Sequence, residues 1–123
     1  MISKPSPWTV AETVSRLRDV IAAKGLKLFA VFDHSSEAKA NGLTLRDTKV
    51  VVFGSPLAGT PVMQARPLAA FDLPLKVLVW DDDGQTRLAY APPAELAARY
   101  DLDDELAARL AGIDALTDAV IDE

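Results

Sequence analysis

The sequence predicts an α+β domain in which an antiparallel sheet of about four strands carries helices packed mainly on one face. Short runs rich in β-branched and aromatic residues alternate with segments of helical periodicity along the chain. The last two of these runs are separated by Asp-Asp-Asp-Gly alone, a hairpin turn that requires antiparallel pairing. Helical segments stand at both ends of the chain, where they can cover one face of the sheet.

The first predicted helix, TVAETVSRLRDVIAAKGL, has clear signals at both ends. Thr9 and Glu12 have the spacing of a capping box, and Gly25 stands where a left-handed residue ends a helix. Glu12 and Arg16 can pair on its outer face. Apolar residues recur at helical spacing along it, namely Val10, Val14, Leu17 and Ile21.

The segment LKLFAVFDH follows as a strand rich in β-formers. Because side chains alternate along a strand, its neighbours Asp33 and His34 are expected to point to opposite faces of the sheet. In SSEAKANG, Ser35 or Ser36 is expected to cap a short helix, and Gly42 is expected to end it.

A central strand, a short helix and a hairpin are predicted next. TKVVVFGS is the most hydrophobic strand, and GSPLAGTP is a loop by composition. We expect Thr60 to cap a short helix with Pro61 at its first position, and Pro67 to end it. The hairpin is LKVLVWDDDGQTRLAYA, in which Leu75, Val77 and Val79 alternate with Lys76, Leu78 and Trp80 before the turn, and Leu88 and Tyr90 lie in the return strand.

The end of the chain is predicted to be helical and acidic. Pro92 and Pro93 open a short helix, and a longer helix is expected at about 102–122. Residues 101–123 contain eight acids and one base, Arg109, which gives this segment a charge of −7, whereas residues 1–100 carry +2. The apolar positions of the longer helix form one stripe of Leu106, Leu110, Ile113, Leu116, Val120 and Ile121.

The composition is that of a globular chain that builds its own core. With 123 residues, of which 50% are hydrophobic and 25% are charged, we expect a single domain over 1–123 with its core at 9–100. Cysteine is absent, which excludes disulfides, thiolate chemistry and cysteine-based metal sites. No apolar run approaches the ~18 residues of a membrane span, so we expect no membrane segment and a cytoplasmic location.

The same composition argues against nucleic-acid and metal partners. Basic residues are scattered singly, without the clusters and interleaved aromatics of a nucleic-acid surface. One histidine and no cysteine leave only carboxylate metal sites, and the turn at 81–84 lacks the alternation and closing glutamate of a calcium loop. We therefore expect no metal and no cofactor.

Two segments contain candidate site residues. His34, the single histidine, stands at a predicted strand end, where it either bonds a neighbouring backbone group or contacts a ligand. In GSPLAGT, backbone N–H groups and the hydroxyls of Ser55 and Thr60 are placed where an anion could bind. The alternative for this loop is a tight connection in which Gly54 and Gly59 are needed for positive φ angles.

The chain resembles the family known as domain of unknown function 302. The resemblance spans about residues 9–100, and its more specific parts are the strand ending in Asp33-His34, the run Gly54 to Met63, and Asp72-Leu73-Pro74-Leu75-Lys76. It implies an α+β fold grouped with TATA-box-binding-protein-like sheets, and it implies no DNA binding, since a fold does not determine a function. The family has no established activity. The resemblance nevertheless favours a role for His34, the loop GSPLAGT and Met63, because they stand in the segments that make the family recognisable.

Three functions remain open on the sequence. The first is a binding module for a small molecule, an anion being favoured, in which the end of LKLFAVFDH and the loop GSPLAGT converge on one pocket. The second is a structural or interaction domain that forms a homodimer. The third is an enzyme with His34 as general base. For the first, the predicted ligand-binding residues are His34, Gly54, Ser55, Gly59, Thr60 and Met63; no catalytic residue is assigned.

Overall fold

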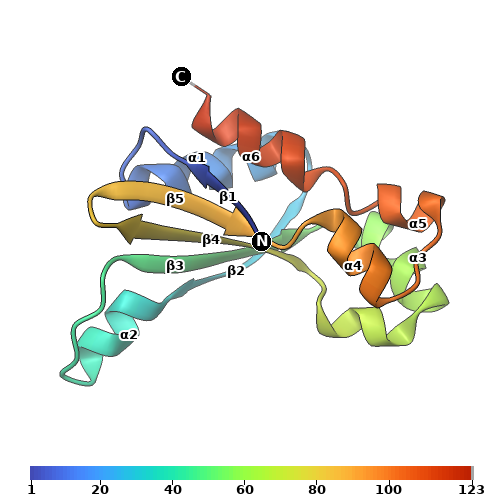
Figure 1. Cartoon of the computed structure of the whole chain (residues 1–123), viewed down its shortest axis with the longest axis horizontal. Helices are drawn as coiled ribbons and strands as arrows, with labels where there is room; N and C mark the ends of the chain where they lie inside the picture. Colours follow the sequence, from blue (N-terminus) through green and yellow to red (C-terminus); the bar gives the residue numbers. More distant parts are fainter. Residues whose placement is uncertain (123) are drawn as a thin grey trace.

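The computed structural model describes residues 1–122, which form a five-stranded antiparallel sheet with α1 and α6 over one face (Figure 1). The strands lie in the order β1-β5-β4-β3-β2, and every neighbouring pair is antiparallel. Their bounds are β1 (Ile2–Pro5), β2 (Lys27–Asp33), β3 (Thr48–Gly54), β4 (Leu75–Asp82) and β5 (Gln85–Tyr90). The α+β class and the antiparallel pairing are confirmed.

Six α-helices and one 3₁₀ helix, η1, connect and follow these strands within residues 1–122. Their bounds are α1 (Val10–Ala23), α2 (His34–Ala40), α3 (Pro56–Ala65), η1 (Pro67–Phe71), α4 (Pro93–Arg99), α5 (Asp104–Ala108) and α6 (Ile113–Ile121). None of the helices in this part of the chain is both long enough and apolar enough to cross a membrane.

The main core lies between the sheet and the helices α1 and α6. Both helices lie above the sheet in Figure 1, on what we call the covered face. Leu17 and Ile21 of α1 and Leu116 and Val120 of α6 are at most 1% exposed there. Alternate strand residues complete this core, namely Val51, Phe53, Val77, Val79, Leu88 and Tyr90.

The fifth strand, β1, is the one that the sequence does not reveal. It pairs with β5, placing Ile2 opposite Tyr90 and Pro5 opposite Arg87. Because β1 is at the edge of the sheet, Pro5 is tolerated there, whereas a proline in a central strand would remove a ladder hydrogen bond. The expected count of about four strands is therefore too low by one.

Helix α1 has the predicted ends, but its arginine has a different partner. Glu12 N donates to Thr9 Oγ1 at 3.1 Å, and Gly25 has a φ of +69°. Arg16 does not pair with Glu12; its guanidinium donates to the carbonyls of Val120 at 2.8 Å and Asp122 at 2.9 Å. It thereby satisfies the free carbonyls at the end of α6.

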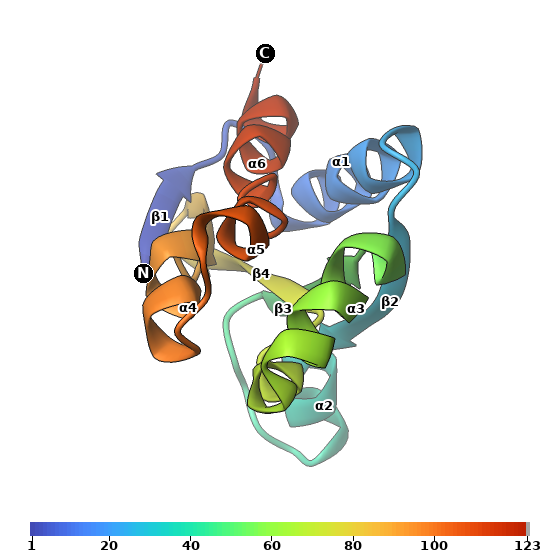
Figure 2. The ribbon, with the colours of Figure 1, turned by 90° about the vertical axis from the view of Figure 1, so that its right-hand side faces the viewer.

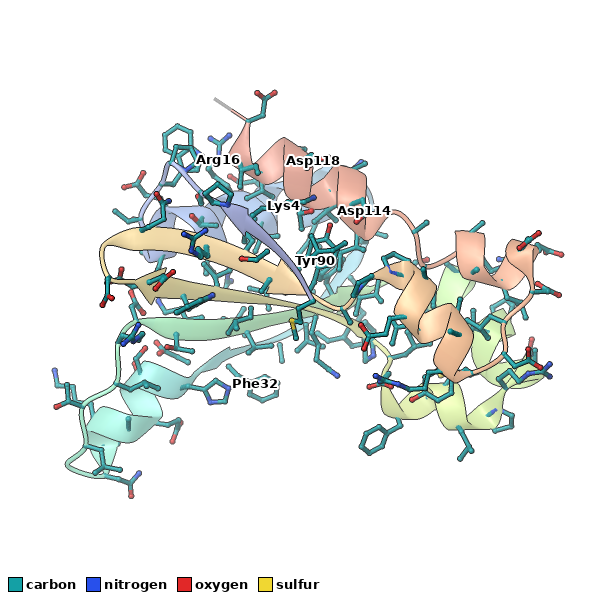
Figure 3. All side chains as sticks on the ribbon, viewed as in Figure 1. Lys4, Arg16, Phe32, Tyr90, Asp114 and Asp118 are labelled. Carbon is teal, nitrogen blue, oxygen red and sulfur yellow. The ribbon has the colours of Figure 1, made fainter. Side chains whose placement is uncertain are left out.

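Lys4 of β1 makes a second attachment to α6 (Figure 3). Its Nζ donates to Thr117 Oγ1 at 2.7 Å and to Asp118 Oδ1 at 2.8 Å. The two cations Lys4 and Arg16 thus hold the acidic C-terminal helix against the body of the protein.

The single helix expected at about 102–122 is divided into α5 and α6. Leu106 and Leu110 pack with Leu96 in a second, smaller core, whereas the apolar residues of α6 belong to the main core. One straight helix cannot bury both groups, so the chain turns between Arg109 and Gly112. The apolar stripe was predicted, but not the break within it.

Two predicted helix caps are wrong. Ser55, not Thr60, is the cap of α3, with its Oγ accepting from Ala58 N at 3.2 Å, and Pro61 lies inside the helix. Asp33, rather than Ser35 or Ser36, is the cap of α2. Aspartate caps a helix as well as serine does, so the sequence alone did not show which of Asp33, Ser35 and Ser36 is the cap.

Both serines instead donate to the Asp33 carboxylate. Ser35 Oγ is 2.7 Å and Ser36 N 3.0 Å from Asp33 Oδ1, and Ser36 Oγ is 2.8 Å from Oδ2. These hydrogen bonds, the one from the Ser35 hydroxyl foremost, lower the pKa of Asp33 to about 2. Residues 33–36, Asp-His-Ser-Ser, therefore form the start of helix α2.

The hairpin has the predicted turn. Asp83 and Gly84 both have positive φ, at 49° and 95°, as a two-residue type I′ turn requires. Asp81 Oδ1 accepts from Gly84 N at 2.7 Å, which fixes the turn further.

Burial of α6 leads to a stability prediction. Leu116 is 1% exposed, so Leu116→Ala is expected to lower the free energy of unfolding by about 2–5 kcal/mol in urea titrations. Leu57 is 87% exposed, and Leu57→Ala is expected to change it by less than about 0.5 kcal/mol. Equal losses in the two variants would mean that α6 is not part of the core.

The Asp33 cap leads to a pH prediction. The pKa of Asp33 is about 2 in the folded protein, below the roughly 3.9 of an unfolded aspartate. A lowered folded-state pKa contributes stability that is present above about pH 4 and is lost as pH falls toward 2. Asp33→Asn should therefore lower the Tm near neutral pH, and its difference from the wild type should shrink over that window. Asp19→Asn, which changes an exposed carboxyl on α1, is the control; a constant Asp33→Asn difference down to the lowest pH would contradict the cap.

Candidate functional site

A cavity of about 520 Å³ lies at the end of the sheet where β3 stops, lined by α3, α6 and the chain that follows α1. Figure 2 shows these elements from that end of the sheet. Its lining is mostly apolar, and its volume is that of a small-molecule site. Phe53 and Leu75 come from the sheet, and Ile113 and Leu116 from α6. The same buried helix that completes the core therefore also forms a wall of the cavity.

Strand pairing brings the first wall of the cavity together. β2 and β3 are antiparallel, with Lys27 opposite Gly54, so the start of β2 lies beside the end of β3. Leu26 and Phe29 enter the lining from this side. A register irregularity between Leu28 and Ala30 interrupts the strand alternation at Phe29.

The predicted loop residues form the second wall. Gly54, Ser55, Gly59, Thr60 and Met63 all line the cavity. Thus five of the six predicted ligand-binding residues lie together, on the end of β3 and on α3, although most of the expected loop is helix.

The glycines in this wall are not there for backbone reasons. Neither Gly54 nor Gly59 is among the residues with positive φ, so that expectation is wrong. A Cβ added at Gly54 would meet Pro74 Cβ at 3.5 Å, which is ordinary contact. A Cβ added at Gly59 would meet only Met63 Cε, at 4.0 Å, so a side chain there has room.

Among residues 1–122, the cavity lining contains two cations and no carboxylate. Lys24, just after α1, and Arg109, between α5 and α6, are the charged lining residues. Arg109 Nη2 has an ion pair with Glu105 Oε1 at 3.2 Å, and within residues 1–122 Lys24 has none. An exposed pair of this kind is worth at most about 1 kcal/mol, so Arg109 is available to another anion at little cost.

Sequence reasoning missed both cations. Lys24 is one of several single lysines, with no pattern that marks it. The sequence does mark Arg109 as a candidate for anion binding, because it is the one base among the eight acids of residues 101–123. Its position on the cavity depends on the break between α5 and α6, which the sequence did not reveal.

A polar brace holds the segment that carries Leu73 and Pro74 into the lining. Asp72 Oδ2 accepts from Arg99 Nη1 at 2.7 Å and from the hydroxyl of Tyr100. The hydrogen bond from Tyr100, with the charge of Arg99, lowers the pKa of Asp72, and the same carboxylate raises the pKa of Tyr100. The brace ties the chain before β4 to α4.

His34 lies at the opposite end of the sheet from the cavity. Asp33 pairs with Lys49, whereas Lys27 pairs with Gly54. Six residues of strand separate the two ends, or roughly 20 Å at ~3.3 Å per residue. His34 is exposed and is the first residue of α2, not a strand residue. The expected convergence of His34 with GSPLAGT is therefore wrong, because antiparallel pairing sends the two segments to different ends.

Nothing in the described chain gathers ligands for a metal. Among residues 1–122, no group of three or more histidine, aspartate or glutamate side chains is close enough to hold an ion. The chemistry that the cavity offers is apolar contact, the Ser55 and Thr60 hydroxyls, and two positive charges.

Curated relatives match most of this chain but less than half of their own length. The chain is 36% identical over 103 residues to the fluoride-specific ion channel FluC 1 of Brucella suis and to FluC 2 of Brucella melitensis. The match covers 83% of this chain and 41% and 38% of those proteins. The chain thus spans about two-fifths of the curated relatives it matches.

A solved structure and a family model cover nearly the whole chain. The crystal structure of an uncharacterized conserved protein DUF302 from Bacillus stearothermophilus matches with a TM-score of 0.82, over 98% of this chain and 94% of that one. At 20% identity this match shows a shared fold. The family model described as Domain of unknown function DUF302 matches residues 2–120, beyond the expected core at 9–100 and into β1 and α6. The chain therefore belongs to the DUF302 family.

Proposed function

We propose that the chain is a binding module for a small amphipathic anion, a molecule with an apolar body and one acidic group. The observation that carries the proposal is the composition of the cavity lining within the described residues: it is mostly apolar, with Lys24 and Arg109 as its charged residues and no carboxylate. Apolar walls supply affinity, and a few placed polar groups orient the ligand.

The energetics favour a ligand that uses both features. Burying apolar surface contributes roughly 25 cal/mol per Å², so an eight-carbon chain gains several kcal/mol in the cavity before the cost of association. An acidic group on the ligand gains further binding free energy from the two cations of the lining. Each 1.4 kcal/mol of that gain raises the affinity about tenfold. A purely polar ion would gain nothing from the walls.

Fluoride, the ion in the names of the relatives, fits the lining poorly. It is a small and strongly hydrated anion, and a mostly apolar cavity of about 520 Å³ offers little to replace its hydration. We therefore favour an organic anion as the ligand of this cavity. The alternative function, an enzyme with His34 as general base, stays a prediction. His34 lies at the end of the sheet opposite to the cavity, so the cavity gives that function no support.

The charge requirement can be tested with octanoate as the probe, and 1-octanol and sodium fluoride as controls. Octanoate is expected to raise the Tm, octanol to raise it less, and fluoride to leave it unchanged, since only a ligand of the folded state stabilises it. In Lys24→Gln/Arg109→Gln the octanoate effect should fall to that of octanol, a loss in affinity of about tenfold or more. Arg18→Gln, on the exposed side of α1, is the matched control and should behave as wild type. Equal shifts by octanoate and octanol in the wild type would contradict an anion site.

The position of the ligand can be tested at Gly59. Gly59→Ala removes the helix penalty of glycine without strain, so it should stabilise the unliganded protein by about 0.5–1 kcal/mol. Gly59→Leu should fold, fill the cavity and abolish the octanoate shift in Tm. Ala65→Leu adds the same bulk at the exposed end of α3 and should leave the shift intact. Wild-type binding of octanoate by Gly59→Leu would place the ligand elsewhere.

A further inference from the structure

We call the face of the sheet opposite α1 and α6 the open face. Among residues 1–122, no helix layer corresponding to α1 and α6 covers it (Figure 1). Strand pairing sets Phe32, Val50, Leu78 and Ala89 in one row across four strands on this face. Phe32 is 55% exposed and points to the open side (Figure 3). The row is apolar where a solvated sheet face is usually polar.

Two walls border the open face at opposite ends of the strands. α2 with the chain that follows it lies below the sheet at one end, and η1 lies below it at the other (Figures 1 and 2). Each wall carries large exposed apolar side chains. These are Leu43 and Leu45 after α2, and Leu68 and Phe71 in η1.

From this arrangement we infer that the open face is a homodimer interface, in which two copies pack face to face with their sheets crossed at near right angles. The two walls bound the open face at the two ends of its strands, and the outer strands β1 and β2 bound it at its sides. A twofold axis lying in the interface, at 45° to the strands, places the walls of each copy along the outer strands β1 and β2 of the other. Such a contact is isologous and closes on itself.

The dimensions of the sheet suit this packing. The eight residues of β4 span about 26 Å at ~3.3 Å per residue, which sets the distance between the walls. Five strands at ~4.8 Å give a sheet about 24 Å wide. One copy's sheet therefore fits between the walls of the other, and orthogonal sheet packing of this kind is one of the two common arrangements.

The available apolar area also suits a second copy. Phe32, Leu43, Leu45, Leu68 and Phe71 are 55%, 67%, 44%, 80% and 86% exposed. At roughly 200 Å² for a fully exposed side chain of this size, they offer on the order of 600 Å² per protomer, before the rest of the sheet face is counted. A standard interface buries ~800 Å² per partner.

The charge distribution selects the open face over the covered one. The acidic segment at residues 101–123 carries −7, and its helix α6 lies on the covered face. Pairing through the open face keeps the two acidic segments on the outer sides of the dimer. Pairing through the covered face would bring like charges together, which is unfavourable.

The test is the mass of the full chain in solution, measured by light scattering at micromolar concentration. Wild type is expected at twice the chain mass of 13.2 kDa. Phe32→Asp places a charge in the interface and should weaken dimerisation by about 100-fold or more, which gives a monomer. Phe71→Asp does the same from the η1 wall, at a residue so exposed that folding should not be affected.

Ser15→Asp is the control, because Ser15 is exposed on α1 and thus on the covered side, and this variant should remain a dimer. Gly59→Leu should also remain a dimer, so loss of ligand binding and loss of assembly are separable. A monomeric wild type overturns the proposal. A dimer that survives both Phe32→Asp and Phe71→Asp overturns it as well, since the contact would then lie on another surface.

Discussion

Burial of α6 against the sheet is the interaction on which the rest of the structure depends. Leu116 and Val120 close the main core, and Ile113 with Leu116 lines the cavity, so one helix serves both. Two cations of the body hold α6 in place: Lys4 binds its middle and Arg16 binds its last carbonyls. Composition alone separates this acidic terminal segment from the body, yet its helix α6 is part of the core. The acidic residues among 101–122 stay exposed, and several of them pair with the body, as Asp118 does with Lys4.

The break before α6 has a functional meaning as well as a packing one. α5 and Leu110 close a small core with α4 and α3, and the turn from Arg109 to Gly112 crosses to the sheet beside the cavity. Arg109 is placed on the cavity by that crossing. The brace of Asp72 with Arg99 and Tyr100 fixes the facing segment, so polar contacts outside the cavity set the positions of apolar walls inside it.

Local signals in the sequence were sufficient for the start of α1 and for the hairpin turn, but not for the caps of α2 and α3, where neighbouring residues offer more than one capping side chain. The capping box of α1 and the Asp-Gly hairpin turn were predictable because their hydrogen bonds close within four residues. The grouping of Gly54 to Met63 on one wall follows from one helix. The other failures depend on distant partners: Ile2–Pro5 is a strand only because β5 is beside it. The antiparallel register of β2 and β3 decides that His34 and Gly54 lie at opposite ends. Lys24 and Arg109 both reach the cavity lining through tertiary packing, for which no local pattern exists.

Strand β3 has a property that neither surface reveals alone. Phe53 lines the cavity, while Val52, its immediate neighbour, is on the open face, because side chains alternate along a strand. A single layer of backbone therefore separates the ligand site that we propose from the assembly surface that we propose. A substitution that displaces β3 would therefore disturb the two surfaces together, without a relay of intermediate residues.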